Sequence, residues 1–170
     1  MPIDMRTAAR FAATKVLVVD DEHFMRKVVR TLLMSIGIGT VFEAADGLDG
    51  LEQIRRERPD VVIVDWNMPQ LDGPGFVRLV RSPTTFVYPD VPLIMLTGHG
   101  ERSRVVEAMR LGVNEYLLKP VSAHSLQERL TAVLINPRPI IQRAGYYGPA
   151  PRDEVARIHA DNDRSIAMLE

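Results

Sequence analysis

Carboxylates follow two apolar runs in this chain. Residues 61–64 are four consecutive β-branched residues, and Asp65 comes directly after them. Residues 15–19 are followed by Asp20 and Asp21. A strand that is buried on both faces has no polar side for a carboxylate, and open α/β sheets bind ligands at the carboxyl ends of their strands. We therefore expect Asp65 to be the working residue of a site at that edge.

Two more polar side chains end predicted strands. Thr97 ends the apolar run 92–97, and Lys119 follows the run 114–118. In a parallel sheet these ends share one edge, so three carboxylates, a hydroxyl and an ammonium gather there. Carboxylates about 4 Å apart repel by roughly 4 kcal/mol per pair at an effective dielectric constant of about 20, so a cation must offset the charge. Oxygen ligands without His or Cys favour Mg²⁺, which takes phosphate oxygens as further ligands, so the pattern indicates phosphoryl chemistry.

Strands and helices alternate through the middle of the chain. Apolar runs predict strands at 15–21, 40–44, 61–65, 92–97 and 114–118. Helical spacing and cap signals predict helices at 22–36, 48–57, 75–81, 101–111 and 123–135. This alternation is typical of an α/β fold with a parallel sheet covered on both sides, because parallel crossovers need helices. Alternation alone leaves the strand order open.

Length and composition limit the classes of function. The 170 residues, 46% of them hydrophobic, predict one core and about one domain. A net charge of -1 supplies no general field for nucleic acid or anionic lipid, so we expect neither partner. The absence of cysteine fits a cytoplasmic protein. Residues 1–14 lack the apolar block of a signal peptide, and we expect a loose N-terminal arm there.

Several short segments stand in one order on these elements. They are Asp20-Asp21-Glu22, Asp65-Trp66-Asn67-Met68-Pro69 with Asp72-Gly73, Leu96-Thr97-Gly98, and Tyr116-Leu117-Leu118-Lys119-Pro120. With these segments the chain resembles the receiver domain of bacterial two-component response regulators over about residues 15–135. The resemblance implies a flavodoxin-like, doubly wound sheet of five parallel strands in the order 2-1-3-4-5 with five helices, the order that chemotaxis receivers share with flavodoxin.

The resemblance also implies a role for each residue of the site. Asp65 is expected to be the phosphoacceptor, attacking a phosphohistidine on a sensor histidine kinase or a histidine phosphotransfer protein. Asp21 and Asp65 are expected to hold Mg²⁺ with side-chain oxygens and Asn67 with its backbone carbonyl, while Asp20 acts through water. Lys119 is expected to pair with the phosphoryl oxygens as a point charge.

Switching and tuning residues follow from the same resemblance. Thr97 is expected to bond a phosphoryl oxygen, and Tyr116 to turn inward as the switch aromatic. Asn67 and His99 stand two residues after Asp65 and Thr97, where family members tune the lifetime of the phosphoryl group. Structural alternatives remain at single positions, since a threonine can satisfy loop backbone and a tyrosine can be a half-buried strand residue. An aspartate such as Asp20 can also cap a helix.

Residues 136–170 form a C-terminal extension beyond the expected receiver. Ile140, Ile141, Tyr146 and Tyr147 are apolar or aromatic among loop formers, and a helix is plausible from about residue 152. The segment carries no basic face for reading DNA. Its apolar residues predict either packing back on the receiver or docking to a partner, and a partly ordered tail is the alternative.

We therefore expect a single-domain response regulator that is not an enzyme. Phosphorylation would switch its binding to a downstream protein target that the sequence does not name, and a homodimer is possible. One alternative is an adaptor or dimerisation subunit that acts mainly through the extension. A second alternative is a magnesium-dependent aspartyl-phosphate phosphatase, but haloacid-dehalogenase-like enzymes need a second Asp two residues after the nucleophile. Asn67 occupies that place.

Overall fold

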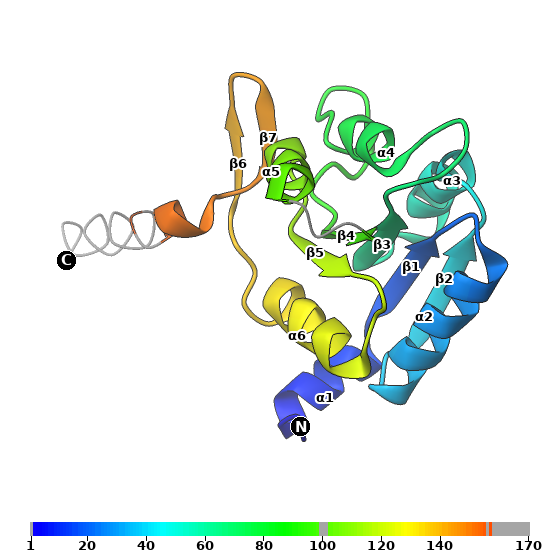
Figure 1. Ribbon diagram of the computed structural model, residues 1–170. Coiled ribbons are helices and arrows are strands. Elements are labelled where there is room, and N and C mark those ends of the chain that lie inside the picture. Colours follow the sequence, from blue (N-terminus) through cyan, green and yellow to red (C-terminus); the bar gives the residue numbers. More distant parts are fainter. Residues whose placement is uncertain (1, 99–101, 156, 158–170) are drawn as a thin grey trace, which may run out of the picture.

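A five-stranded parallel sheet forms the centre of the protein. The computed structural model describes residues 2–98, 102–155 and 157. The strands have the order β2-β1-β3-β4-β5, all neighbours being parallel (Figure 1). Their bounds are Lys15–Val19 for β1, Thr40–Ala44 for β2, Val61–Asp65 for β3, Leu93–Thr97 for β4 and Glu115–Leu118 for β5. The doubly wound, flavodoxin-like fold expected from the resemblance is confirmed.

Helices cover both faces of this sheet. The helices are α2 (His23–Ser35), α3 (Gly47–Glu57), α4 (Gly73–Val80), α5 (Arg102–Leu111) and α6 (Ala123–Leu134). One core cluster joins Leu17 and Val64 to α3, α4 and α5, and the other joins Val18 and Ile63 to α2 and α6. Neighbouring residues of a strand thus enter opposite cores, which is why the strands are apolar throughout. No helix within the described ranges is long and apolar enough to cross a membrane.

The expectation of a loose N-terminal arm is wrong. Residues Met5–Ala12 form helix α1, whose first turn is capped by the Asp4 side chain accepting a hydrogen bond from the Thr7 amide. Phe11 is fully buried in the core cluster shared with α2 and α6. Gly39 lies so close that a Cβ there would be 1.9 Å from the Ala12 carbonyl oxygen. Thr7 and Phe11, four residues apart, form the buried side of this amphipathic helix, while Arg6 and Arg10 are exposed.

A buried arginine holds the long loop between α4 and β4. The Arg81 guanidinium donates to the carbonyl oxygens of Gly112, Pro89 and Val91 and to the side-chain oxygen of Asn114, at 2.6 to 2.9 Å. Burial lowers the pKa of Arg81 to about 10. Since the bonded groups come from the ends of α5 and β5 as well as the loop, this side chain ties the edge of the sheet to the loop beside it.

The first part of the C-terminal extension is a β-hairpin. Strands β6 (Ile140–Arg143) and β7 (Tyr146–Pro149) pair antiparallel beside α5 (Figure 1). Gly145 has φ +76 in the turn, a conformation that glycine adopts without strain. The sequence predicts no strand here, because loop formers interrupt the apolar residues. Helical structure from residue 152, as expected, is present at 152–155, and the later part of that expected helix lies mostly outside the described residues.

We predict that Phe11 contributes strongly to stability although it precedes the sheet. Phe11→Ala leaves a cavity under α1 and should lower the free energy of unfolding by about 3 kcal/mol in urea denaturation followed by circular dichroism. Met5→Ala on the same helix is the matched control, because Met5 is 90% exposed. Equal stabilities of the two variants would show that α1 is not docked.

Candidate functional site

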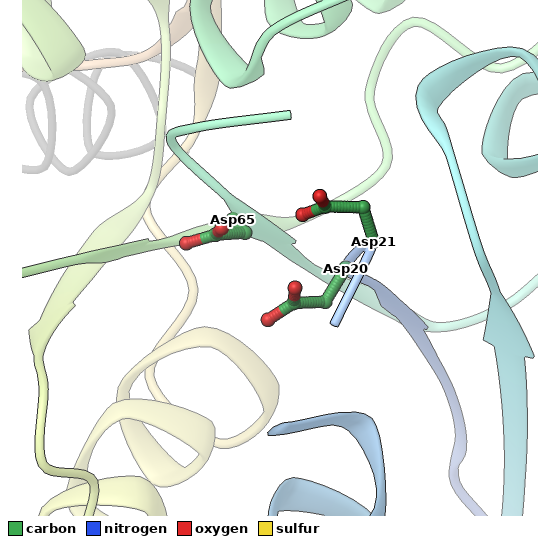
Figure 2. A group of neighbouring side chains, drawn as sticks. All are labelled: Asp20, Asp21 and Asp65. Atoms are coloured by element: carbon green, nitrogen blue, oxygen red, sulfur yellow. The ribbon is translucent and has the colours of Figure 1, made fainter. Parts of the chain in front are cut away.

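Three carboxylates meet beyond the ends of β1 and β3. Asp65 is the last residue of β3, and Asp20 and Asp21 directly follow β1. One oxygen from each lies within 4.8 Å of the others (Figure 2). The strands bring them together because β1 and β3 are parallel neighbours in register, with Val19 beside Val64. The predicted convergence at the sheet edge is therefore found in the structure.

Asp20 is the most deeply buried of the three. Its side chain is fully buried, and one oxygen accepts a hydrogen bond of 2.9 Å from the Glu22 amide. The other oxygen, Oδ2, has no hydrogen-bond partner among the residues that the structure describes. Burial raises the pKa of Asp20 to about 6, and the negative charges of Asp65 and Asp21 act in the same direction. A buried carboxylate oxygen without a donor suits a bound cation.

Asp65 is paired with the one ammonium group in this cluster. Its side chain is nearly buried, and Lys119 Nζ lies 2.8 Å from its Oδ1. Burial raises the pKa of Asp65, although the hydrogen bond and charge of Lys119 oppose that rise. Burial also lowers the pKa of Lys119, but the hydrogen bond and charge of Asp65 outweigh it and the pKa is raised. The contact at 2.8 Å thus favours the charged form of each group, against the effect of burial.

Strand pairing between β4 and β5 positions the other predicted residues. Thr97 ends β4 and is buried, opposite Leu118 of β5. The Lys119 amide donates to the Thr97 carbonyl oxygen at 2.9 Å, and the peptide bond from Lys119 to Pro120 is cis. Thr97 and Lys119 thus come to the same edge as Asp65. His99, the second proposed tuning position, lies outside the described residues.

The loop after β3 forms the wall of the site. Gly73 opens α4 close to the strand, and a Cβ there would lie 2.6 Å from the Asp65 carbonyl oxygen. Its amide donates to the Trp66 carbonyl oxygen at 2.8 Å, and Asp72 caps α4 by accepting from the Gly75 amide. The glycine and the cap therefore turn the chain sharply back over the site.

An open cavity of about 530 Å³ lies in front of the cluster. It is lined by Asp21, Glu22, Asp65, Asn67, Met68, Pro69, Asp72 and Lys119. Asn67, a proposed ligand and tuning residue, is exposed on this wall. Glu22 and Asp72 were quoted from the sequence only as parts of motifs. Their place in the lining follows from the folding of the two loops, which local sequence does not specify.

Tyr116 is a residue of β5, the edge strand of the sheet. Its ring is partly buried against the core cluster of α3, α4 and α5. The guanidinium of Arg129, on α6, lies over the ring with its central carbon 5.7 Å from the centroid. The Tyr116 ring therefore packs on the core and also contacts a cationic side chain of α6. This half-buried position is compatible both with a strand aromatic and with the proposed switch.

Sequence comparison gives the family. The model of the response regulator receiver domain matches residues 16–131, which is more than half of the chain. The chain belongs to the response regulator receiver family. The match covers β1 to β5 and most of α6, while α1 and the β6–β7 hairpin lie outside it.

Individual relatives are similar over the receiver region. Chemotaxis protein CheY1 of Helicobacter pylori is 38% identical over 71% of this chain and 96% of its own. CheY-3 of Vibrio cholerae is 35% identical over 70% of this chain and 90% of its own. Among solved structures, chemotaxis protein CheY4 of Vibrio cholerae has a TM-score of 0.64 at 36% identity and is covered to 98%, over 71% of this chain.

A further structural neighbour bears on the acidic cluster. The receiver domain of a sensor histidine kinase from Pseudomonas aeruginosa has a TM-score of 0.63 at 29% identity, with 72% of this chain and 98% of that chain covered. It is described with a magnesium ion coordinated in its active-site cleft. In the present receiver, the carboxylate cluster and the unpartnered oxygen of Asp20 offer only oxygen ligands, which fits the same kind of hard cation.

We predict that Asp20→Asn stabilises the metal-free protein. The folded-state pKa of about 6 exceeds the ordinary value of 3.8, so ionisation of Asp20 lowers stability as pH rises through that window. At pH 7.5 with a chelator, the amide should raise the free energy of unfolding by on the order of 2 kcal/mol in urea denaturation. Asp21→Asn, the same change at an exposed neighbour, should have a smaller effect. A loss of stability in Asp20→Asn would contradict this account of the cluster.

Proposed function

We propose that this receiver accepts a phosphoryl group on Asp65 from a histidine kinase or a histidine phosphotransfer protein and that phosphorylation switches its protein contacts. The observation that carries the proposal is the pairing of a nearly buried Asp65 with Lys119 at 2.8 Å, next to a second buried carboxylate with an unpartnered oxygen. A salt bridge with only a structural role would not need a second buried carboxylate. A site that binds a cation beside a phosphoryl group needs that carboxylate to hold the cation.

Mg²⁺ is the cofactor that this ligand set fits. Asp21 and Asp65 would hold it with carboxylate oxygens and Asn67 with its backbone carbonyl, while Asp20 would act through water. When bound, Mg²⁺ neutralises negative charge on the transferring phosphoryl group. The unpartnered Oδ2 of Asp20 supports an additional polar group at this place, because a buried oxygen without a donor is unfavourable by itself.

Asp65 is proposed to act as the nucleophile. Its carboxylate faces a cavity of about 530 Å³ that is open to solvent, so a partner's phosphohistidine can enter. An Asp65 oxygen attacks phosphorus, the bond from phosphorus to the histidine nitrogen breaks, and its electron pair remains on the imidazole. Lys119, now paired with Asp65, is proposed to pair with the phosphoryl oxygens after transfer, as a point charge.

The response to phosphorylation is proposed to run through β4 and β5. Thr97 would bond a phosphoryl oxygen, and Tyr116 would turn inward as Thr97 moves. The two strands pair directly, with Met95 beside Tyr116 and Thr97 beside Leu118, which supports coupling between these positions. The surface altered by this motion comprises α5, β5 and α6. Asn67 and His99 are proposed to tune how long the phosphoryl group persists.

The output of such a receiver is a change of binding, and the chain is proposed to act as a signalling protein instead of an enzyme that turns over a substrate. An aspartyl-phosphate phosphatase of the haloacid-dehalogenase kind needs an acid two residues after the nucleophile. Asn67 supplies an amide at that place. It cannot protonate a leaving group, so the site does not favour that alternative.

We predict Mg²⁺-dependent phosphorylation of Asp65 by a small donor. Incubation with acetyl phosphate and Mg²⁺ should add one phosphoryl mass to the intact protein, and Asp65→Ala should abolish the addition. Omission of Mg²⁺ should lower the labelling at least about tenfold, since charge on the transferring group is then not neutralised. The measurement is intact-protein mass spectrometry over a time course.

Asp72→Asn is the matched control for this experiment. Asp72 lines the same cavity, and an asparagine can still cap α4, so labelling should persist. Labelling that survives in Asp65→Ala at the wild-type rate would place the phosphoacceptor elsewhere. Steady hydrolysis of a phosphate ester by the wild-type protein would instead favour the phosphatase.

A further inference from the structure

The C-terminal extension is bound to the start of β5 by Arg138, and a backbone hydrogen bond joins its own two ends. Arg138 donates to the Asn114 carbonyl oxygen at 2.5 Å and to the Ala150 carbonyl oxygen at 2.8 Å. The Ala150 amide donates to the Pro139 carbonyl oxygen at 2.8 Å, and Ala150 is fully buried. The two ends of the β6–β7 hairpin are thus joined to each other and held next to β5, the edge strand of the sheet.

The next anchor is an ion pair between Arg152 and Glu115. Arg152 Nη2 lies 2.5 and 2.6 Å from the two carboxylate oxygens of Glu115, a residue of β5 that is only 3% exposed. Arg129 is the other cation beside Glu115 and lies farther away, with Nη1 3.7 Å from Oε2. A buried carboxylate that loses its close partner is strongly unfavourable, so Arg152 holds the extension in place.

The docked extension covers part of the surface of α5 and β5. A largely apolar groove of about 730 Å³ separates α5 from the hairpin. Its lining includes Val105, Val106 and Met109 from α5 and Ile141, Pro149 and Pro151 from the extension. Arg152 also lines it, so one residue serves both as wall of the groove and as anchor on β5. The extension thus forms one wall of the groove and α5 forms the other.

Arg129 connects this anchor to the proposed switch. Its guanidinium contacts both Glu115 and the ring of Tyr116, which are successive residues of β5. Its Nε is buried and has no hydrogen-bond partner among the described residues. The Arg129 side chain thus has one N–H donor without an acceptor and contacts two neighbouring residues of β5. If the ring of Tyr116 moves inward, the attraction between ring and guanidinium is lost and Arg129 can take the place of Arg152 on Glu115.

We infer that residues 136–155 form an intramolecular clamp on the α5–β5 surface, which phosphorylation of Asp65 releases through competition between Arg129 and Arg152 for Glu115. The inference rests on the proposed function of Asp65. In the unphosphorylated receiver the clamp covers the surface, and in the phosphorylated receiver the hairpin leaves it.

Hydrogen–deuterium exchange of the full chain tests the clamp. A hairpin that has left its support is marginally stable, so its amides exchange faster. With Mg²⁺ and beryllofluoride as phosphoryl mimic, exchange over residues 140–150 should become about tenfold faster in the wild type. Arg152→Ala should show this faster exchange without the mimic. Arg129→Gln should bind the mimic, seen as protection near Asp65, while the hairpin stays slow.

Two control variants separate the possible results. Glu154→Gln removes the exposed ion pair of Arg143 and Glu154 within the same extension and should leave the exchange of the hairpin close to wild type. Asp65→Asn should abolish the response to the mimic. Protection near Asp65 without any change at residues 140–150 would overturn the clamp and leave the proposed function standing. Absence of any protection near Asp65 would overturn both.

Discussion

The structure depends on holding several carboxylates together at the edge of a buried sheet. The side chains of Asp20 and Asp65 are almost fully buried. Both have raised pKa values because burial disfavours their charged forms. Lys119 supplies one positive charge at 2.8 Å from Asp65. One ammonium does not compensate three carboxylates, so the site carries excess negative charge that a divalent cation would offset.

The fold maintains this arrangement through a few close contacts. Gly73 permits the loop after β3 to lie against Asp65, and Asp72 begins α4 at that point. On the other side, the amide of Lys119 is bound to the carbonyl of Thr97, so the ammonium and the hydroxyl are carried by paired strands. Main-chain hydrogen bonding thus joins the ends of β4 and β5 directly.

The extension gives this receiver contacts that its family match does not include. The match ends at residue 131, and the hairpin beyond it is attached to β5 through Glu115 and to the end of α5 through glycines. Gly112 and Gly148 approach so closely that a Cβ on Gly148 would lie 2.8 Å from the Gly112 Cα. Such fitted contacts distinguish a docked element from a tail that merely lies nearby.

The sequence by itself determined the sheet and the identity of its carboxylate site. The apolar runs of β1 and β3 and the residues at their ends are local signals, because burial on both faces requires continuous apolar residues. Local pattern could not show that Asp20 is buried and Asp21 exposed, since that depends on which side of the edge each residue faces.

Only the tertiary structure decided the positions of α1 and the hairpin and the partner of Glu115. Phe11 anchors α1 by fitting a core made of distant residues, and Arg152 reaches Glu115 across 37 positions of the chain. Local sequence cannot show which distant surface each segment contacts, although Thr7 and Phe11 of α1 have helical spacing. These contacts exist because the folded receiver presents a buried carboxylate and an apolar surface that the flanking segments can cover.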